Sequence, residues 1–355
     1  MSKIKLCPEC GVPRSITKHN IWLSNGTILE DNDPNHRVVF IESDGLRDTF
    51  VGVEETVGIS IERIITESQR RSTYESVTRT LPAPLKPILR WTGTGLISRY
   101  LVKSGRLNGK GAIEITSFRR RKGKDDYIKL RIREPFSLPH FCGNFAGAME
   151  AVDGREISVT YEEISPDEYE LTAHISTHPR ELKERLQRKA PRYKPGDIEL
   201  PRCVVCGAPA IISEYAWRLD RGVIESKKSG RRMTVVSTAT QDAIMDELIR
   251  ELGDPVTQAV VEAQRSLVTS GFFSSGEITG TDDFRNQFAY RGLGNLVEID
   301  LDHDHLHVRI ENPCLHAMVV GLVQGLYEHA SGGQSHLEWE TTADGDLVVD
   351  VRSRK

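Results

Sequence analysis

The chain has 355 residues, of which 38% are apolar and 28% are charged, and its formal net charge is −4. This length favours two domains over a single core. The mild acidity argues against a general nucleic-acid-binding protein, which needs a broad positive field. No apolar run is long enough to span a bilayer, because the longest, at 314–327, is interrupted by His316 and Gln324. We therefore expect a cytoplasmic protein with no signal peptide, no membrane span and no nucleic-acid partner.

The first motif along the chain is a Cys-x-x-Cys-Gly sequence at residues 7–11, and it occurs again at 203–207. Further matches follow in the same order, at a spacing that shrinks from 196 to 178 residues. They include Pro13 with Pro209, Gly26 with Gly222, Glu67 with Glu262, Arg70 with Arg265, Gly143 with Gly321, and Gly147 with Gly325. This pattern predicts two tandem repeats, 1–178 and 199–355, joined by a basic linker at 179–198 and related by a pseudo-twofold axis.

The two cysteine pairs are the strongest chemical signal in the sequence. A tetrahedral zinc ion needs two such pairs, and repeats that pack near their N-termini would bring together Cys7, Cys10, Cys203 and Cys206. Four protein ligands leave no open coordination position, so this zinc would be structural. Two alternatives stay open: each pair is a vestigial knuckle or free dithiol, or the cysteines serve an iron–sulfur or redox role.

Several elements are expected in the first part of each repeat. Asn25-Gly26 suits a tight hairpin turn, and Ser43-Asp44 can cap a helix that Gly58 ends. Glu67 and Arg70 have the i,i+3 spacing of an ion pair on one helix face, as do their matches in the second repeat. In the first repeat we expect a hairpin of 16–23 with 27–30, a strand at 37–42, and helices at 46–57 and 59–80.

The later part of each repeat predicts a second hairpin, a Pro corner, a helix of small residues and a final strand pair. Two glycines four apart weaken a helix, so close contact with a sheet, a partner helix or a ligand should compensate at Gly143/Gly147 and Gly321/Gly325. The expected strands are 111–118, 127–133, 156–163 and 168–175 in the first repeat, and 296–301, 305–310, 335–341 and 346–351 in the second.

The corner at Asn312-Pro313 and the following Gly321-x-x-x-Gly325-x-x-Glu328 helix resemble the 4-vinyl-reductase-like, or hydrocarbon-binding, domain family. The resemblance is best over 111–175 and 295–351. It implies an antiparallel sheet with helices packed on one side, related to haem-NO-binding and vesicle-tethering folds, and a role in holding a small apolar molecule. Together with the duplication, it gives our predicted class: α+β, with two tandem copies of this sheet-and-helix unit.

Candidate ligand contacts are apolar and aromatic residues near the seam between helices and sheet, where plain core packing is the alternative. They are Trp91, Phe141, Phe145, Tyr290, Met318 and Leu322. His303, His305 and His307 would share a strand face, but the first repeat has Tyr127 and Lys129 at the last two positions. We therefore expect an incidental histidine-rich turn. Cys142 and Cys314 are expected to be small buried residues rather than nucleophiles.

The predicted function is a non-enzymatic module that binds a small apolar molecule, carries a structural zinc and reports to a protein partner. The alternative is an accessory or assembly subunit that acts as a scaffold in an enzyme complex. An enzyme is disfavoured, since no catalytic set and no nicotinamide or flavin fingerprint is present.

Overall fold

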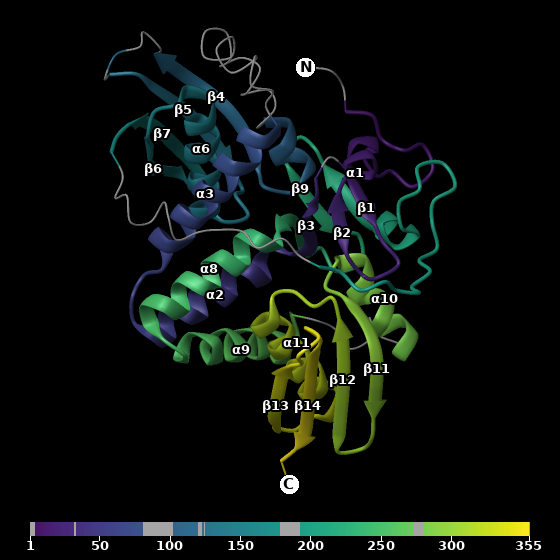
Figure 1. The fold of residues 1–355 in the computed structure, drawn as a ribbon. Coiled ribbons are helices and arrows are strands. Elements are labelled where there is room, and N and C mark those ends of the chain that lie inside the picture. Colours follow the sequence, from purple (N-terminus) through teal and green to yellow (C-terminus); the bar gives the residue numbers. More distant parts are fainter. Residues whose placement is uncertain are drawn as a thin grey trace. The chain divides into compact units, whose positions relative to one another are not determined.

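The computed structural model describes residues 4–31, 33–80, 102–119, 123, 125–177, 192–272 and 280–354. It is a mixed α+β protein in which helices pack against antiparallel sheets (Figure 1). Its residues form two compact units. Unit 1 is drawn from Ser60–Arg188 and Tyr215–Thr234, and unit 2 from Lys5–Ile59, Lys189–Glu214 and Val235–Lys355. Each unit therefore takes segments from both predicted repeats, in contrast to boundaries at 178 and 199.

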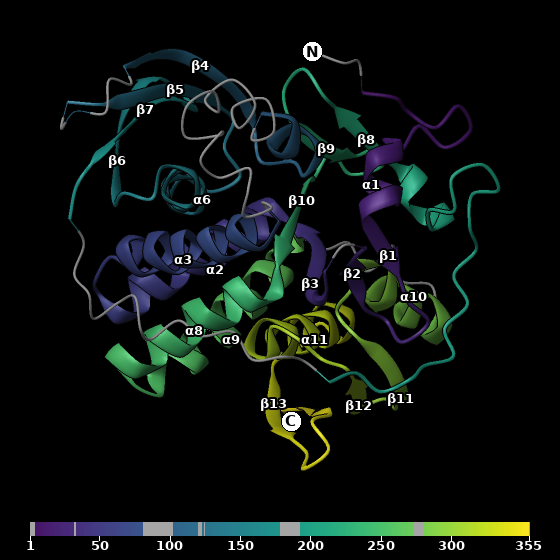
Figure 2. The ribbon, with the colours of Figure 1, turned by 45° about the horizontal axis from the view of Figure 1, so that its top comes forward.

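Unit 1 is built on a four-stranded antiparallel sheet with the strand order β4-β5-β7-β6. Helix α6 covers one face of this sheet, and α3 packs on the other side of α6 (Figure 2). Along β5, buried and partly exposed residues alternate, as in a sheet covered on one face. The elements are α3 (Glu62–Thr80), β4 (Ala112–Arg119), β5 (Tyr127–Arg133), α6 (Leu138–Asp153), β6 (Ile157–Ser165) and β7 (Glu168–Ile175), with β8 (Tyr215–Arg218), β9 (Val223–Ser226) and the start of β10 (Arg232–Ser237).

Unit 2 contains a second four-stranded sheet, β11-β12-β14-β13, which repeats the strand order of the first. Helix α11 packs on it and on α9, and α9 contacts α2 and α8. The elements from the first half of the chain are α1 (Arg14–His19), β1 (Asn20–Trp22), β2 (Ile28–Glu30), β3 (Asp33–Glu42) and α2 (Ser43–Val57). Those from the second half are the 3-10 helix Ala210–Glu214, α8 (Thr238–Leu252), α9 (Pro255–Leu267), the π-helix Val268–Phe272, α10 (Thr281–Arg291), β11 (Asn295–Leu301), β12 (His305–Glu311), α11 (His316–Ser331), β13 (Ser335–Thr341) and β14 (Leu347–Ser353).

The glycine pairs of the two small-residue helices sit at helix–helix contacts. A Cβ added at Gly147 would lie 2.1 Å from the backbone oxygen of Arg70 in α3, and one added at Gly321 would lie 2.3 Å from that of Val261 in α9. Only glycine permits this approach, so the expected close contact is confirmed, with a partner helix as the neighbour.

Each half has an early hairpin, with its turn at Gly26 or Gly222, and a late segment that begins near Gly111 or Gly294. The early hairpin of each half packs on the late segment of the other half. In unit 2 the Gly294 N–H donates to the Gly26 carbonyl at 3.1 Å. In unit 1 the Gly111 N–H donates to the Gly222 carbonyl at 2.9 Å. Gly26 and Gly222 are the hairpin turns that match in sequence, so the two units contain the same contact, built each time from opposite halves of the chain.

A tryptophan anchors each of these hairpins. The Trp22 indole N–H donates to the Tyr290 carbonyl at 2.9 Å in unit 2, and the Trp217 indole N–H donates to the Leu107 carbonyl at 3.0 Å in unit 1. A buried indole needs such a partner, and each bond fixes the hairpin on the segment that it crosses.

Matching ion pairs tie the long helices to the small-residue helices. Arg70 contacts Glu67 at 2.9 Å and Glu150 at 3.6 Å. Arg265 contacts Glu262 and Glu328, each at 2.5 Å. The predicted i,i+3 pairs are confirmed, and each arginine also reaches a glutamate on the neighbouring helix.

Two local predictions were wrong. Residues 16–19 belong to α1 rather than to a strand, and the amide of Asn20 ends that helix by donating to the Ile16 carbonyl at 3.0 Å. Helix α2 begins at Ser43, without a side-chain capping bond from Ser43 or Asp44. Both errors arise at short helix ends, where hydrophobic periodicity carries little information. Most of the predicted linker lies outside the described residues.

Candidate functional site

The first cysteine knuckle is a tight turn closed by backbone hydrogen bonds. The Cys7 N–H donates to the Val12 carbonyl at 2.8 Å, and the Gly11 N–H donates to the Cys7 carbonyl at 3.0 Å. Gly11 has a φ of 75°, a left-handed conformation that favours glycine. The turn therefore explains why glycine follows the second cysteine.

The second knuckle repeats this geometry. The Cys203 N–H donates to the Ala208 carbonyl and the Gly207 N–H donates to the Cys203 carbonyl, both at 2.8 Å, and Gly207 has a φ of 74°. Both knuckles belong to unit 2. The chain thus presents two equivalent pairs of thiols from opposite halves of the sequence.

The four sulfur atoms converge on one point. The Sγ atoms of Cys7, Cys10, Cys203 and Cys206 all lie within 4.8 Å of one another. Cys7 and Cys203 are 3.8 Å apart, and Cys10 and Cys206 are 3.4 Å apart. In a tetrahedron with Zn–S bonds of about 2.3 Å, neighbouring sulfurs are about 3.8 Å apart. The donor set and its dimensions therefore fit a four-coordinate thiolate metal site.

The electrostatics of the cluster require a cation for full ionisation. The backbone N–H of Cys10 lowers the pKa of Cys7 to about 6, against the effect of burial, which acts to raise it. Burial raises the pKa of Cys10 to about 12, and it also raises the pKa of Cys206. Ionisation is therefore favoured at Cys7 and disfavoured by burial at Cys10 and Cys206. A divalent cation at the centre would stabilise all four thiolates together.

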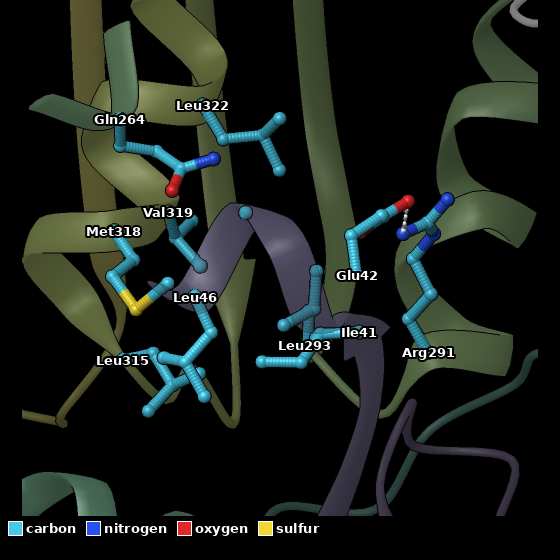
Figure 3. A pocket seen from close by; sticks show the side chains of 11 residues that line it. Ile41, Glu42, Leu46, Gln264, Arg291, Leu293, Leu315, Met318, Val319 and Leu322 are labelled. Atoms are coloured by element: carbon cyan, nitrogen blue, oxygen red, sulfur yellow. Dashed lines mark hydrogen bonds and ion pairs between the residues drawn. The ribbon is translucent and has the colours of Figure 1, made fainter. Parts of the chain in front are cut away.

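An apolar pocket lies elsewhere in unit 2, with a volume of about 40 Å³. Figure 3 shows its walls, which come from the end of β3 and the start of α2 and from α9, α10 and α11 with their adjoining loops. The lining residues are Ile41, Glu42, Gly45, Leu46, Gln264, Arg291, Leu293, Leu315, Met318, Val319 and Leu322.

Three polar side chains reach this otherwise apolar pocket. Glu42 and Arg291 form a buried ion pair at one end. Gln264 lies at another point of the wall, where its Oε1 accepts a hydrogen bond from the Thr49 hydroxyl at 2.9 Å. The pocket thus offers apolar surface together with a few fixed polar groups, the usual composition of a small-molecule site.

The residues predicted to contact a ligand lie in different parts of the structure. Met318 and Leu322 lie together on the pocket wall. Tyr290 is 1% exposed and does not line the pocket, but its hydroxyl accepts from Arg291 Nε at 3.1 Å and so positions that side chain. Phe141 and Phe145 belong to the apolar core of unit 1, between α6 and its sheet. Trp91 lies outside the described residues.

Sequence reasoning missed the wall that the first half contributes, notably Ile41, Leu46 and the Glu42–Arg291 pair. Ile41 and Leu46 fall within the predicted strand 37–42 and the predicted helix 46–57. No local sequence pattern predicts that these two residues lie beside α11 of the second half. Their position depends on which half's late segment the early hairpin packs against.

The remaining two cysteines are buried and belong to no metal cluster in the described part of the chain. Burial raises the pKa of Cys142 to about 12 and that of Cys314 to about 11. A thiol with so high a pKa is a poor nucleophile, so the expectation that both are small buried residues is confirmed.

Comparison with known proteins found no matching family model, no matching curated protein and no matching solved structure. Among the described helices, none combines the length and the apolar character that crossing a bilayer requires.

Proposed function

We propose that this protein is a non-enzymatic binding protein in which a structural zinc ion joins the two halves of the chain and a pocket in unit 2 takes a small apolar molecule. The convergence of four sulfurs from two knuckles carries the zinc assignment. The two knuckles have the same geometry, so tandem duplication accounts for them. The protein resembles hydrocarbon-binding domains in sequence, which supports the ligand class.

The zinc has a structural role in this proposal. Four thiolates fill the tetrahedron and leave no position for water or substrate, so the ion contributes folding energy rather than catalysis. Cys7 and Cys10 come from the first half, and Cys203 and Cys206 come from the second. Metal loading therefore couples the folding of segments almost 200 residues apart.

Metal analysis tests the proposed zinc site. We expect about one zinc per chain in protein purified under reducing conditions without chelator, and loss of that zinc in the Cys7→Ser variant. Cys142→Ser and Cys314→Ser are matched controls, because these cysteines lie outside the cluster, and both variants should keep the metal. Iron in place of zinc, or no metal in the wild-type protein, would refute the assignment.

The pocket restricts the ligand that we propose. Its volume of about 40 Å³ is far below the roughly 300 Å³ at which drug-sized sites begin. As it stands it admits only a few non-hydrogen atoms. Met318 is flexible and Leu322 is only partly buried, so rotation of these two side chains is the cheapest way to enlarge it.

Binding of toluene, followed by NMR of the methionine methyl groups, tests this site. We expect weak binding by the wild-type protein, tighter binding after Leu322→Ala enlarges the pocket, and loss of binding after Leu322→Phe fills it. Leu337→Ala, which removes a partly buried leucine on β13 away from the pocket, is the control. This pocket would be excluded as the binding site if neither substitution at Leu322 changed the affinity for toluene, or if Leu322→Ala did not bind toluene.

A scaffold role is the second candidate, and exposed apolar residues beside the knuckles favour it. Val204 is 90% exposed between the two cysteines of the second knuckle, and Val205 and Leu6 are also exposed. Exposed apolar residues next to an ordered turn suit contact with a protein partner. Under this reading, Val204→Asp should keep the zinc and abolish a stoichiometric complex with a copurifying protein. A complex that survives the change would exclude this surface.

A further inference from the structure

The second four-stranded sheet carries a row of acidic and histidine side chains across all its strands. Asp300 of β11 pairs in register with His307 of β12, His307 pairs with Asp350 of β14, and Asp350 pairs with Glu338 of β13. The alternation of buried and partly exposed residues along β12 and β14 puts this row on the face opposite α11.

Two imidazoles converge on one carboxylate oxygen in this row. His305 Nε2 lies 3.1 Å and His307 Nδ1 lies 3.0 Å from the same atom, Asp350 Oδ1. The other ring nitrogen of His307 lies 3.8 Å from a carboxylate oxygen of Glu298 on β11. The three converging side chains are 27–29% exposed, so solvent ions reach them while the sheet fixes their backbones.

Among the ion pairs of the described residues, Asp350 has His305 and His307 as partners and no lysine or arginine, although Arg352 of β14 lies opposite His305 in register. Arg309, the arginine of β12, contacts Glu298 and Asp346. In the first sheet, the strand equivalent to β12 is β5, and there Lys129 pairs with Glu170 at 2.5 Å. Asp350 and Glu338 are carboxylates directly opposite each other, an arrangement that is unfavourable without a compensating positive charge.

We propose that His305, His307 and Asp350 form a second metal site, separate from the cysteine cluster and specific for a zinc-like divalent transition metal. Imidazole nitrogens suit Zn²⁺, Ni²⁺ and Cu²⁺, whereas Mg²⁺ and Ca²⁺ prefer an all-oxygen shell. The ion takes the place between the two imidazoles that Asp350 Oδ1 now fills, and small side-chain rotations keep the carboxylate as third ligand. Three protein ligands leave a position for water or for a ligand atom from another molecule.

This site could not be recognised from the histidines alone. Two of three histidines in a turn have no equivalent in the first repeat, which indicated an incidental cluster. The third ligand comes from β14, 43 residues further along the chain than His307. Strand pairing is what converts a His-x-His sequence into three converging ligands.

Calorimetric titration of the zinc-loaded protein with Zn²⁺ tests the proposal, because the cysteine cluster is then already full. We expect one further equivalent to bind. His307→Ala and Asp350→Asn should each weaken this step at least tenfold, the smallest loss usual even for partners outside the first ligand shell. His336→Ala is the matched control: His336 lies on β13 of the same sheet, with its side chain 62% exposed, and its loss should change nothing.

Cobalt spectroscopy separates the two sites. Co²⁺ added to the zinc-loaded protein should give visible d–d bands without thiolate-to-cobalt charge transfer, because the second site contains no sulfur. Each variant should keep its one cysteine-bound zinc, which shows that it is folded. The proposal is overturned if no second equivalent binds, if His307→Ala binds as tightly as wild type, or if His336→Ala loses as much affinity as His307→Ala.

Discussion

Replacing Gly147 with alanine tests whether the contact between α3 and α6 holds unit 1 together. The new Cβ would lie 2.1 Å from the Arg70 carbonyl oxygen, and 3.0 Å from both the Arg70 carbonyl carbon and the Tyr74 nitrogen. All three atoms are backbone, so no side-chain rotation removes the overlap. Helix α3 has to move away from α6.

The size of the effect follows from two opposing terms. Real Cβ contacts essentially never fall below 3.0 Å, so the helices must separate locally by about 0.9 Å, the difference between 3.0 and 2.1 Å. Overpacking costs roughly 1–3 kcal/mol, and a clash with backbone atoms, which no side-chain rotation relieves, falls in the upper part of that range, roughly 2–3 kcal/mol. Alanine returns up to about 1 kcal/mol of helix propensity. We expect a net loss of about 1–2 kcal/mol in the free energy of unfolding of unit 1.

Hydrogen exchange through a urea series measures this locally, because the two units need not unfold together. The amides of α3 and α6 should lose protection, while those of the sheet β11–β14 should not. Gly333→Ala is the control: an added Cβ meets nothing within 4 Å there, and stability should stay within about 0.5 kcal/mol. Equal stability of Gly147→Ala and wild type would refute the close-contact argument.

Three further predictions concern charge and metal. Glu328→Gln removes a nearly buried partner of Arg265 and should cost roughly 2–3 kcal/mol in denaturation experiments; a loss below 0.5 kcal/mol would mean that solvent screens the pair. The hydrogen bond from Arg221 holds the pKa of Glu134 below its ordinary value of 4.5. Its stabilisation is therefore present above that pH and is lost as the pH falls through the lower, folded-state pKa. Carboxyl NMR titration should show this pKa rising in Arg221→Ala, and an unchanged pKa would contradict the assignment. Chelation of the zinc should reduce the thermal stability of wild type but leave that of Cys7→Ser unchanged; equal losses would place the metal elsewhere.

The sequence predicted the cysteine cluster because two equal knuckles in matching places have one simple way to complete a tetrahedron. The late strands were also predictable, since 127–133 and 305–310 alternate apolar and polar residues over their whole length. The glycine helices and the Glu67–Arg70 pair follow from i,i+3 and i,i+4 geometry, which is local.

The assignment of hairpins to units was not predictable, for a physical reason. Gly26 contacts Gly294, whereas its own half offers Gly111, which makes the same contact with Gly222. Both late segments present a glycine N–H to a turn carbonyl, so local chemistry does not distinguish the two arrangements. The pocket wall formed by Ile41 and Leu46 depends on this choice and was missed with it.

Because the early hairpin of each half packs on the other half, neither unit can be completed from one half of the chain during translation. When residue 178 has been made, the chain contains the sheet of unit 1 but lacks segment 215–234 of the same unit. The hairpin at Gly26 also lacks its contact with Gly294, which has not yet been made. Unit 1 is complete only once residue 234 has been made, and unit 2 only once the end of the chain has been made. Two separately expressed halves would have to associate to form the contacts of Gly26 with Gly294 and of Gly111 with Gly222.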